Sequence, residues 1–490
     1  MRRLLRLAAF AVAVDAFLPP GGGARPLRAL RAPLCAKKKA AKAKGAKRGV
    51  GFGGGASRTG VWEGCEALRA WIARNGGDGD GVNVGDVGGG LRGVTAARDF
   101  KRGDVLFKLP LATCVLSAGR ADASPVGRAV WAASARGPRL ALPPNIRVAL
   151  LVLWLEASAE RDAWGPYLDC LPSAADFAAD GGPMELWTPA EIAAVECGQL
   201  AREVGRRSAQ LREMYEQLAP RWAAALASDD ADARALGGVP VPSFDAVRLA
   251  VCQTTSRAYG FGPDELERVA LDGGGAGAEG VSSMLVPGVD LCNHAHPPVH
   301  TAHWLDARGA HFVVAAEAPI KAGEQVWLTY GPLPSRLLLS QFGFVLPKPS
   351  AADFAMLRLD PLLAAAAGAD ATAADALWEA ANALDAASDA LLRDPATGRV
   401  SRWQPTGDAT RRAVDALAGA GGVAQLGYAG LLRRQLDEYS TTAEADEEEL
   451  RGAAPAPRRA AALRLRVLTK RVLQRELAAV SPEVDERAPA

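Results

Sequence analysis

The sequence predicts an α+β protein, in which a β-rich core is interrupted by a helical insert and followed by an all-helical C-terminal domain. Segments with β-branched or alternating apolar residues occur in two distant regions, 91–110 and 284–329. The region between them, 143–235, has helical spacing, and the chain is helical again from Pro347 to about Val480. Strands and helices that are segregated in this way are typical of α+β folds.

The predicted elements of the core follow one another in a simple order. The apolar spacing over 62–73 predicts a helix, and a Gly/Asp-rich loop runs from there to Gly90. The stretch 91–110 predicts a β-hairpin with its turn at 101–104. Further strands are predicted at 284–289, 311–316 and 325–329, and the strands end near Leu346.

Helix signals are clear in the insert and at the C-terminal end. Pro143 and Pro144 open one helix, and Thr188 precedes another as a cap with Pro189 in its first turn. The spacing of apolar residues over 463–473 predicts a last long helix, and the acidic run 444–449 is interpreted as the solvated face of a helix.

Charge is distributed unevenly along the 490 residues. Residues 1–62 contain fourteen Arg or Lys and one acid, Asp15, a net charge of +13; since the whole chain is +2, the remainder is −11. Such an acidic body argues against a nucleic-acid enzyme, which presents a basic face to phosphates. It suits an enzyme with a protein substrate.

The N-terminal segment is interpreted as a targeting sequence. Residues 1–16 have a basic start, an apolar stretch and a small-residue site, as in a signal peptide, and 17–60 form an acid-free basic segment like a transit peptide. In series they resemble the bipartite presequences of plastid proteins. A secreted protein with a basic tail and a nuclear signal at 37–48 are the alternatives. The apolar stretch is too short to cross a bilayer, and we expect no membrane span in the mature form.

Two motifs and the cysteines give no cofactor or metal site. Residues 88–93 fit G-x-G-x-x-G, but they precede a strand and open no helix, so the dinucleotide-binding context is absent. The five histidines lie within 294–311, but no Cys partners them at zinc-finger spacing. The seven cysteines are scattered singly, as reduced thiols in a metal-free fold are.

Three segments carry the chemistry of the chain. They are "LRGVTAARDFKRGDVLFKLP" at 91–110, "LVPGVDLCNHAHPP" at 285–298 and "KAGEQVWLTYGPLPSRLLLSQFGFV" at 321–345. In order and spacing they resemble the SET methyltransferases, in particular the branch of the Rubisco large-subunit lysine methyltransferases. The stretches 164–172, 186–192 and 254–260 are similar to the insert and the Ser-Arg-aromatic segment of that branch, and the helices up to 480 to its substrate-binding domain.

The resemblance implies S-adenosylmethionine as the cofactor and assigns roles residue by residue. Tyr330 falls at the position of the catalytic tyrosine. Cofactor-binding positions are Gly90, Leu91, Arg92, Arg257, Asn293, His294, Phe342 and Phe344. Substrate-binding positions are Arg257, Tyr259 and Asp290.

Three residues depart from the pattern of the family. Ala295 replaces the usual Ser, Ser335 the usual Asn, and Phe342 a residue that is often Tyr. Ala295 and Phe342 each lack a hydroxyl, and Ser335 is a shorter polar residue than Asn, so the resemblance leaves the strength of the activity open.

The same resemblance divides the chain into domains and suggests a substrate. It implies a SET domain at 65–346 with a helical insert at about 130–250, and a substrate-binding domain at 350–480. The function it implies is protein-lysine N-methylation by a monomer, with a plastid protein such as the Rubisco large subunit or aldolase as the substrate. A protein-histidine methyltransferase and a non-catalytic binding module that kept the fold remain the alternatives.

Overall fold

The elements are described from a computed structural model. It describes residues 62, 64–88, 91–134, 137–260, 283–306, 310–350, 352–355, 392–393, 414–415, 418–419, 423–452 and 455–480. The predicted targeting segments, Gly90 and much of the region 356–422 lie outside these residues.

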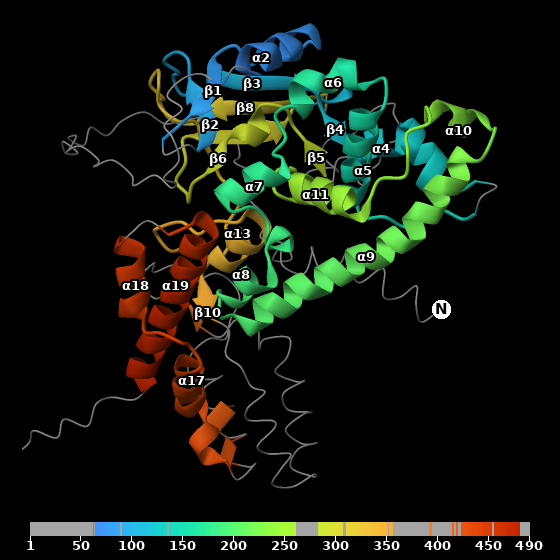
Figure 1. Ribbon diagram of the computed structural model, residues 1–490. Coiled ribbons are helices and arrows are strands. Elements are labelled where there is room, and N and C mark those ends of the chain that lie inside the picture. Colours follow the sequence, from blue (N-terminus) through green and yellow to red (C-terminus); the bar gives the residue numbers. More distant parts are fainter. Residues whose placement is uncertain are drawn as a thin grey trace, which may run out of the picture.

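The strands form small sheets, and all of those labelled in Figure 1 except β10 lie in the upper part of the molecule. β3 (Val105–Pro110), β8 (His311–Ala316) and β7 (Thr301–Leu305) make a three-stranded antiparallel sheet in that order. Four further pairs occur among the described residues: β1 (Val82–Asp86) with β2 (Arg92–Ala96), β4 (Leu116–Ser117) with β5 (Met284–Leu285), β6 (Asn293–His294) with β9 (Trp327–Leu328), and β10 (Phe354–Ala355) with β11 (Leu392–Arg393). The last pair corrects the prediction that the region 350–480 is all-helical. Of these pairs, β6 and β9 are parallel.

The predicted β-hairpin at 91–110 is wrong in its pairing, although both strands exist. β2 pairs with β1, which lies in the stretch predicted to be a loop, and β3 pairs with β8. The linker carries Phe100, which is 1% exposed and bridges Ile320, so the chain crosses from one sheet to another. The predicted turn is present, because the Lys101 amide donates to Asp104 Oδ2 at 2.8 Å.

The strand predicted at 284–289 is shorter than expected. It ends at Leu285, and Gly288 has a φ of +83°, which favours glycine because a Cβ is strained there. The chain then enters a 3₁₀ turn at Val289–Leu291. This turn replaces the end of the predicted strand and positions most of the candidate site.

Helices fill the region between β4 and β5, as predicted. α5 (Pro144–Ala157) begins at the proline pair and is buried on most of its faces, as a helix inside a core is. The others are α4 (Ala118–Ala123), α6 (Arg161–Leu168), α7 (Ala174–Asp180), α8 (Pro189–Ala193), α9 (Gly198–Leu226), α10 (Ala231–Ala235) and α11 (Phe244–Thr255). α2 (Gly64–Arg74) confirms the helix predicted at 62–73, and η1 (Gly127–Trp131) and η2 (Met184–Leu186) are short turns of helix.

One continuous apolar core joins the strands to the insert. Trp71 of α2, Trp164 of α6 and the strand residues Phe107 and Phe312 belong to it, each at most 5% exposed. Because strands from both ends of the SET region share this core with the insert, the insert is an integral part of the domain. The mixed content confirms the predicted α+β class.

α8 confirms the helix start predicted at Thr188. The Thr188 hydroxyl accepts from the Glu191 amide, and the Glu191 carboxylate accepts from the Thr188 amide at 2.7 Å, which is a complete capping box. We expect Thr188→Ala to lower the free energy of unfolding by about 1 kcal/mol. Urea denaturation tests this, with Thr188→Ser as the control that keeps the hydroxyl; an equal loss in both variants would contradict a capping role.

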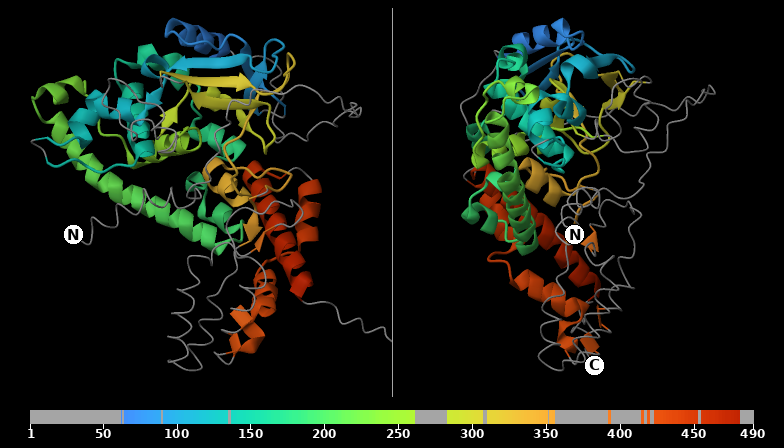
Figure 2. Two further views of the ribbon diagram at one scale, coloured as in Figure 1. Left: turned by 180° about the vertical axis from the view of Figure 1, so that it is seen from behind. Right: turned by 90° about the vertical axis from the view of Figure 1, so that its right-hand side faces the viewer.

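The C-terminal helices pack beneath the insert. α17 (Tyr428–Asp437), α18 (Ala443–Arg451) and α19 (Pro457–Val480) lie side by side, and α19 reaches up to α13 (Ser335–Phe342) (Figures 1 and 2). A second apolar cluster contains Trp187 of the insert, Leu339 of α13 and Leu465 of α19. Arg458 of α19 also donates to the Gly181 carbonyl at 2.9 Å. The C-terminal helices are therefore docked on the SET region.

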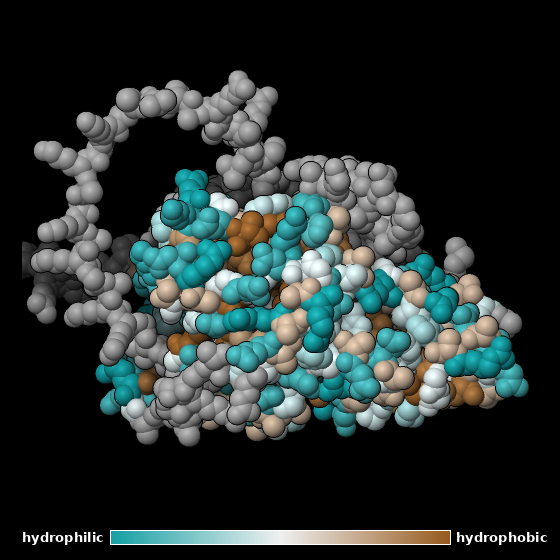
Figure 3. Space-filling view, turned by 90° about the horizontal axis from the view of Figure 1, so that it is seen from above, coloured by the Kyte–Doolittle hydropathy of each residue, from teal (hydrophilic) through white to brown (hydrophobic). Residues whose placement is uncertain are grey.

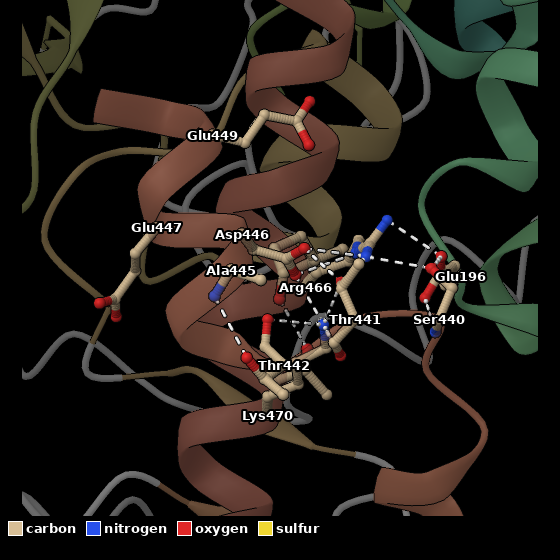
Figure 4. Close-up of polar contacts among 12 residues, drawn as sticks. Glu196, Ser440, Thr441, Thr442, Ala445, Asp446, Glu447, Glu449, Arg466 and Lys470 are labelled. Atoms are coloured by element: carbon tan, nitrogen blue, oxygen red, sulfur yellow. Dashed lines mark hydrogen bonds and ion pairs between the residues drawn. The ribbon is translucent and has the colours of Figure 1, made fainter. Parts of the chain in front are cut away.

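A buried ionic cluster fixes the same contact (Figure 4). Asp446 of α18 is 0% exposed, with Arg466 Nη2 at 2.9 Å and Lys470 Nζ at 2.6 Å. Arg466 also contacts Glu196, which follows α8, at 3.0 Å. The interpretation of the acidic run as a solvated face is therefore wrong for Asp446, since its carboxylate compensates two buried cations, although Glu444 is exposed.

The face of the molecule seen from above is mixed in hydropathy (Figure 3). Seen from above, small hydrophobic patches lie between polar side chains (Figure 3). Among the described residues, the exposed large hydrophobic side chains are Val105, Leu226 and Trp304. None of the described helices has the length and apolar character needed to cross a membrane.

Candidate active site

The turn that follows β5 gathers the side chains of the site. Three of its carbonyls accept hydrogen bonds: Val289 from the Tyr259 hydroxyl at 3.2 Å, Asp290 from Arg257 Nη1 at 2.8 Å, and Cys292 from the Tyr330 hydroxyl at 2.8 Å. The donors come from two distant stretches of the sequence, Arg257 and Tyr259 from one and Tyr330 from the other, and one short turn orients all three.

The Asp290 carboxylate is enclosed. Its side chain is buried at 6% exposure, and Oδ2 accepts from the Tyr167 hydroxyl of α6 at 2.7 Å. Burial raises the pKa of Asp290, and Arg257 opposes that rise. Oδ1 has no hydrogen-bond partner among the described residues.

The parallel pairing of β6 with β9 places Asn293 and His294 beside the strand that leads to Tyr330. Asn293 is opposite Trp327 and His294 opposite Leu328 in the register. Asn293 Nδ2 also donates to the Arg92 carbonyl at 3.1 Å, which ties β6 to β2. Three distant motifs of the sequence therefore meet here.

His294 is held as a neutral imidazole by a backbone hydrogen bond. Its Nδ1 accepts from the Tyr330 amide at 3.0 Å, which assigns the proton to Nε2. Burial, with His296 nearby, lowers the pKa of His294 to about 4. Nε2 has no partner among the described residues, so this N–H is an unused donor.

The lowered pKa of His294 predicts a loss of stability in acid. Its neutral form is favoured by folding, so this stability is present above the unfolded pKa of 6.5 and decreases as the pH falls towards about 4. Thermal unfolding between these pH values measures the loss. His294→Asn, whose amide oxygen can accept from Tyr330, should unfold with a flatter pH dependence. If the stability of the variant depended on pH as steeply as that of the wild type, the loss in acid would come from other groups. His296 and His303 are examples, because burial also lowers their pKa values.

Aromatic rings surround Tyr330. The centroid of its ring lies 5.0 Å from that of His294 and 5.0 Å from that of Phe342, and Phe344 lies 6.3 Å from His294. Burial raises the pKa of Tyr330, so its hydroxyl keeps the proton at neutral pH. A buried, protonated hydroxyl in an aromatic surround can act as a hydrogen-bonding group without becoming a charged base.

Tyr259 belongs to a second aromatic group on the other side of the turn. Its backbone bridges Met284, and its ring contacts His303 at 5.4 Å and Phe312 at 5.2 Å between centroids. His303 in turn stacks on Phe312 with an interplanar angle of 7°. The three-stranded sheet therefore supports Tyr259.

Arg92 enters the site from β2. Its Nη2 donates to the Cys170 carbonyl at 2.7 Å, and burial followed by repulsion from Arg257 lowers its pKa. Leu91 precedes it in a turn, with the Val87 amide donating to the Leu91 carbonyl at 2.9 Å. A Cβ at Gly93 would lie 2.7 Å from Asn293 Nδ2, so this position requires the small residue.

The residues that depart from the family pattern have structural partners. Ser335 is fully buried, and its hydroxyl donates to Asp353 Oδ2 at 2.8 Å. This carboxylate also accepts from the Ser335 and Ser350 amides, so Ser335 joins α13 to the segment after the SET core. The Ala295 amide donates to the Leu328 carbonyl at 2.9 Å, which continues the β6–β9 pairing without a hydroxyl.

The unpaired buried atoms of the site fit a polar ligand. Within the site, Asp290 Oδ1, His294 Nε2, Arg257 Nε and Gln325 Nε2 are buried without hydrogen-bond partners among the described residues, and further such atoms, for example Arg69 Nε, lie elsewhere in the described chain. Buried polar atoms are normally hydrogen-bonded, so such a group is typical of a ligand site. Among the described residues there is no group of three or more His, Cys, Asp or Glu side chains placed to hold a metal ion.

Sequence reasoning missed three parts of this site. These are the hydroxyl of Tyr167 and the carbonyls of Val289 and Cys292. Carbonyls leave no signal in residue types, and Tyr167 is 123 residues from Asp290. The motif "WGPYLDCLP" contains Tyr167 and was the available signal.

Two protein-family models match parts of the sequence. A family model described as SET domain matches residues 91–331, and one described as Rubisco LSMT substrate-binding matches 428–473. No curated protein sequence matches the chain significantly.

Solved structures of similar fold agree with the two family models. The SET domain of LSMT bound to lysine and AdoHcy aligns with a TM-score of 0.57 at 18% identity, covering 85% of this chain and 90% of that one. Rubisco LSMT bound to sinefungin and monomethyllysine aligns with a TM-score of 0.56 at 19% identity, covering 86% and 92%. The AdoMet complex of Rubisco LSMT has a TM-score of 0.55 at 18% identity, with the same coverage. The chain therefore contains a SET domain, followed by a Rubisco LSMT substrate-binding domain.

Proposed function

We propose that this protein transfers a methyl group from S-adenosylmethionine to a lysine side chain of a protein substrate. The observation that carries the proposal is the Tyr330 hydroxyl, fixed 2.8 Å from the Cys292 carbonyl on the turn that also binds Arg257 and Tyr259. The similarity to structures of Rubisco LSMT bound to lysine and AdoHcy supports both the acceptor and the methyl donor.

Methyl transfer requires the protein mainly to position the acceptor amine and the methyl donor and to remove water from the amine. The bound cofactor supplies an electrophilic methyl group on a sulfonium, and the acceptor amine must approach in line and uncharged. Neutralising a lysine of pKa about 10.4 at about pH 7.5 costs about 4 kcal/mol. Burial of the amine reduces this cost, and the positive charges of Arg92 and Arg257 act in the same direction, whereas the Asp290 carboxylate acts against them.

Two tyrosines that are hydrogen-bonded to the turn then orient the acceptor amine. Tyr330 donates its proton to the Cys292 carbonyl, so the lone pairs of its oxygen remain to accept from the amine N–H or to contact the polarised methyl. The Tyr259 hydroxyl bonds to the Val289 carbonyl of the same turn, and its ring would form an aromatic wall for the alkyl part of the lysine.

The cofactor would be held by the unpaired donors of the site and by the backbone around Gly93. Arg257 Nε suits the carboxylate of the amino-acid end, because a guanidinium fork matches a carboxylate. His294 Nε2 and Asn293 would serve the adenine end, with Leu91 and Arg92 alongside and Phe342 and Phe344 as apolar cover.

We also propose that the enzyme acts in the plastid stroma on a protein such as the Rubisco large subunit or aldolase. The support is the acid-free basic segment after a signal-like start, together with the match to a Rubisco LSMT substrate-binding domain at 428–473. We expect a monomer with a protein substrate and no nucleic-acid partner.

The test combines cofactor binding with substrate labelling. The full-length protein is incubated with labelled S-adenosylmethionine and a plastid stromal extract, the labelled band is identified by mass spectrometry, and cofactor binding is measured by calorimetry. A labelled lysine supports the proposal. A labelled histidine would replace it with protein-histidine methylation, cofactor binding without label would overturn the stromal substrate, and neither binding nor label would favour a non-catalytic module.

A further inference from the structure

The helical insert sends one side chain into the candidate site. Tyr167 of α6 is fully buried, and its hydroxyl donates to Asp290 Oδ2 at 2.7 Å. The ring is held by Trp71 of α2, at 6.5 Å between centroids and 24° between planes, and Trp71 Nε1 donates to the Ala163 carbonyl of α6 at 2.6 Å. Two packed helices therefore fix the position of the hydroxyl.

Asp290 has the features of a residue that is prepared for a ligand. Oδ2 is bonded, whereas Oδ1 is buried and has no partner among the described residues. The backbone of the same turn is already occupied, because the Asp290 carbonyl accepts from Arg257 and its neighbours accept from Tyr259 and Tyr330. Leaving a buried carboxylate oxygen unpaired is unfavourable, so a ligand N–H is the expected partner.

We propose that Tyr167 is a positioning residue for the acceptor amine, because it holds the Asp290 carboxylate with Oδ1 directed to an N–H of the acceptor. This inference rests on the proposed function and adds to it a residue of the insert. Asp290 contacts the acceptor, and Tyr167 acts through Asp290.

The charge state of Asp290 depends on its whole surroundings. The titratable and charged groups that act on it or feel its charge are Arg92, Tyr167, Cys170, Arg257, Tyr259, Cys292 and Tyr330. Burial favours the neutral acid, whereas the two arginines and the Tyr167 hydroxyl favour the carboxylate. Without the hydroxyl, Asp290 should become protonated at a higher pH and lose its ability to accept from the amine.

Kinetics of Tyr167→Phe test the inference. We expect the KM for the acceptor protein to rise about tenfold and kcat to change less than about twofold. The variant loses the hydrogen bond to the charged Asp290 carboxylate, which contributes to binding of the acceptor. The ratio of kcat/KM between the variant and wild type should fall further as the pH is lowered from about 9 to about 6. In an Asp290→Asn background, Tyr167→Phe should have no such pH-dependent effect.

A stability measurement separates this inference from the proposed function. The loss of Tm in Tyr167→Phe should be larger at about pH 8 than at about pH 4.5, since the bond to the ionised carboxylate is the stronger one. Tyr215→Phe is the matched control, because its hydroxyl donates to the Pro242 carbonyl at 2.9 Å and should cost the same at each pH.

Two outcomes would overturn the inference. One is a loss in Tyr167→Phe that is equal at every pH and persists in Asp290→Asn, which would make the hydroxyl a structural contact. The other is an unchanged KM with a reduced kcat. If the wild type transfers no methyl group, the proposed function fails, and the pH dependence of Tm still decides whether Tyr167 holds the Asp290 carboxylate.

Discussion

Replacing Tyr330 by Phe should reduce kcat for methyl transfer at least about 100-fold, the loss typical when one preorganised hydrogen-bonding group is removed at a reacting centre. The hydroxyl is oriented by the Cys292 carbonyl at 2.8 Å, and its ring lies among His294 and Phe342. Phe keeps the ring and the backbone amide that donates to His294 Nδ1, so the fold and the cofactor-binding residues should be unaffected.

The measurement is single-turnover transfer from labelled S-adenosylmethionine, with cofactor binding determined by calorimetry. Binding should stay within about twofold of wild type, because the lost interaction serves the transition state. Tyr215→Phe, which removes a hydroxyl remote from the site, should keep full activity. A Tyr330→Phe enzyme with the wild-type rate would remove Tyr330 from the reaction.

The second large effect concerns stability. Asp446→Ala should lower the free energy of unfolding by about 3 to 5 kcal/mol, the cost of removing one partner from a buried ion pair. Arg466 and Lys470 are each 2% exposed, and the variant would leave both cations buried without this carboxylate. Since Arg466 also contacts Glu196, the contact of the C-terminal helices with the insert should weaken at the same time.

Denaturant unfolding of the variant measures this loss. The matched control is Glu449→Ala in the same helix, which removes an exposed pair with Arg459 at 2.7 Å and should cost at most about 1 kcal/mol. Similar losses in the two variants would show that the buried cluster contributes no more than a surface ion pair.

Local patterns of the sequence were sufficient for the helices. The proline pair before α5 and the Thr188 cap of α8 have short-range physical causes, and both helices begin where the sequence indicates. Strand partners were not predictable in this way. The turn at 101–104 suggested that β2 and β3 form a hairpin, but β2 pairs with the strand before it, β1, in a stretch whose Gly and Asp residues predicted a loop. β3 pairs with β8, about 200 residues away, which no local pattern encodes.

Part of the candidate site could likewise be predicted from local motifs, and part of it could not. Tyr330, Asn293 and His294 stand in recognisable motifs, and the structure brings them together through the β6–β9 pairing. Gly90 lies outside the described residues. Tyr167 and the carbonyls of the turn belong to the site because of where the folded chain places them, and the sequence around them does not show this.

The contacts of β6 also determine when the site can form during synthesis. β6 pairs with β9, and Asn293 of β6 donates to the Arg92 carbonyl of β2, so all three strands must be present. Arg92 and Asn293 are 201 residues apart, and His294 needs the amide of Tyr330. At about 5 to 20 residues per second, a ribosome takes roughly 10 to 50 s to pass from the first of these motifs to the last. During that time β3 has no pairing partner, because β8 ends at Ala316, and the partner of β6, β9, has not been made. A chain that folds as it is synthesised therefore exposes the apolar face of β3 to aggregation over this interval.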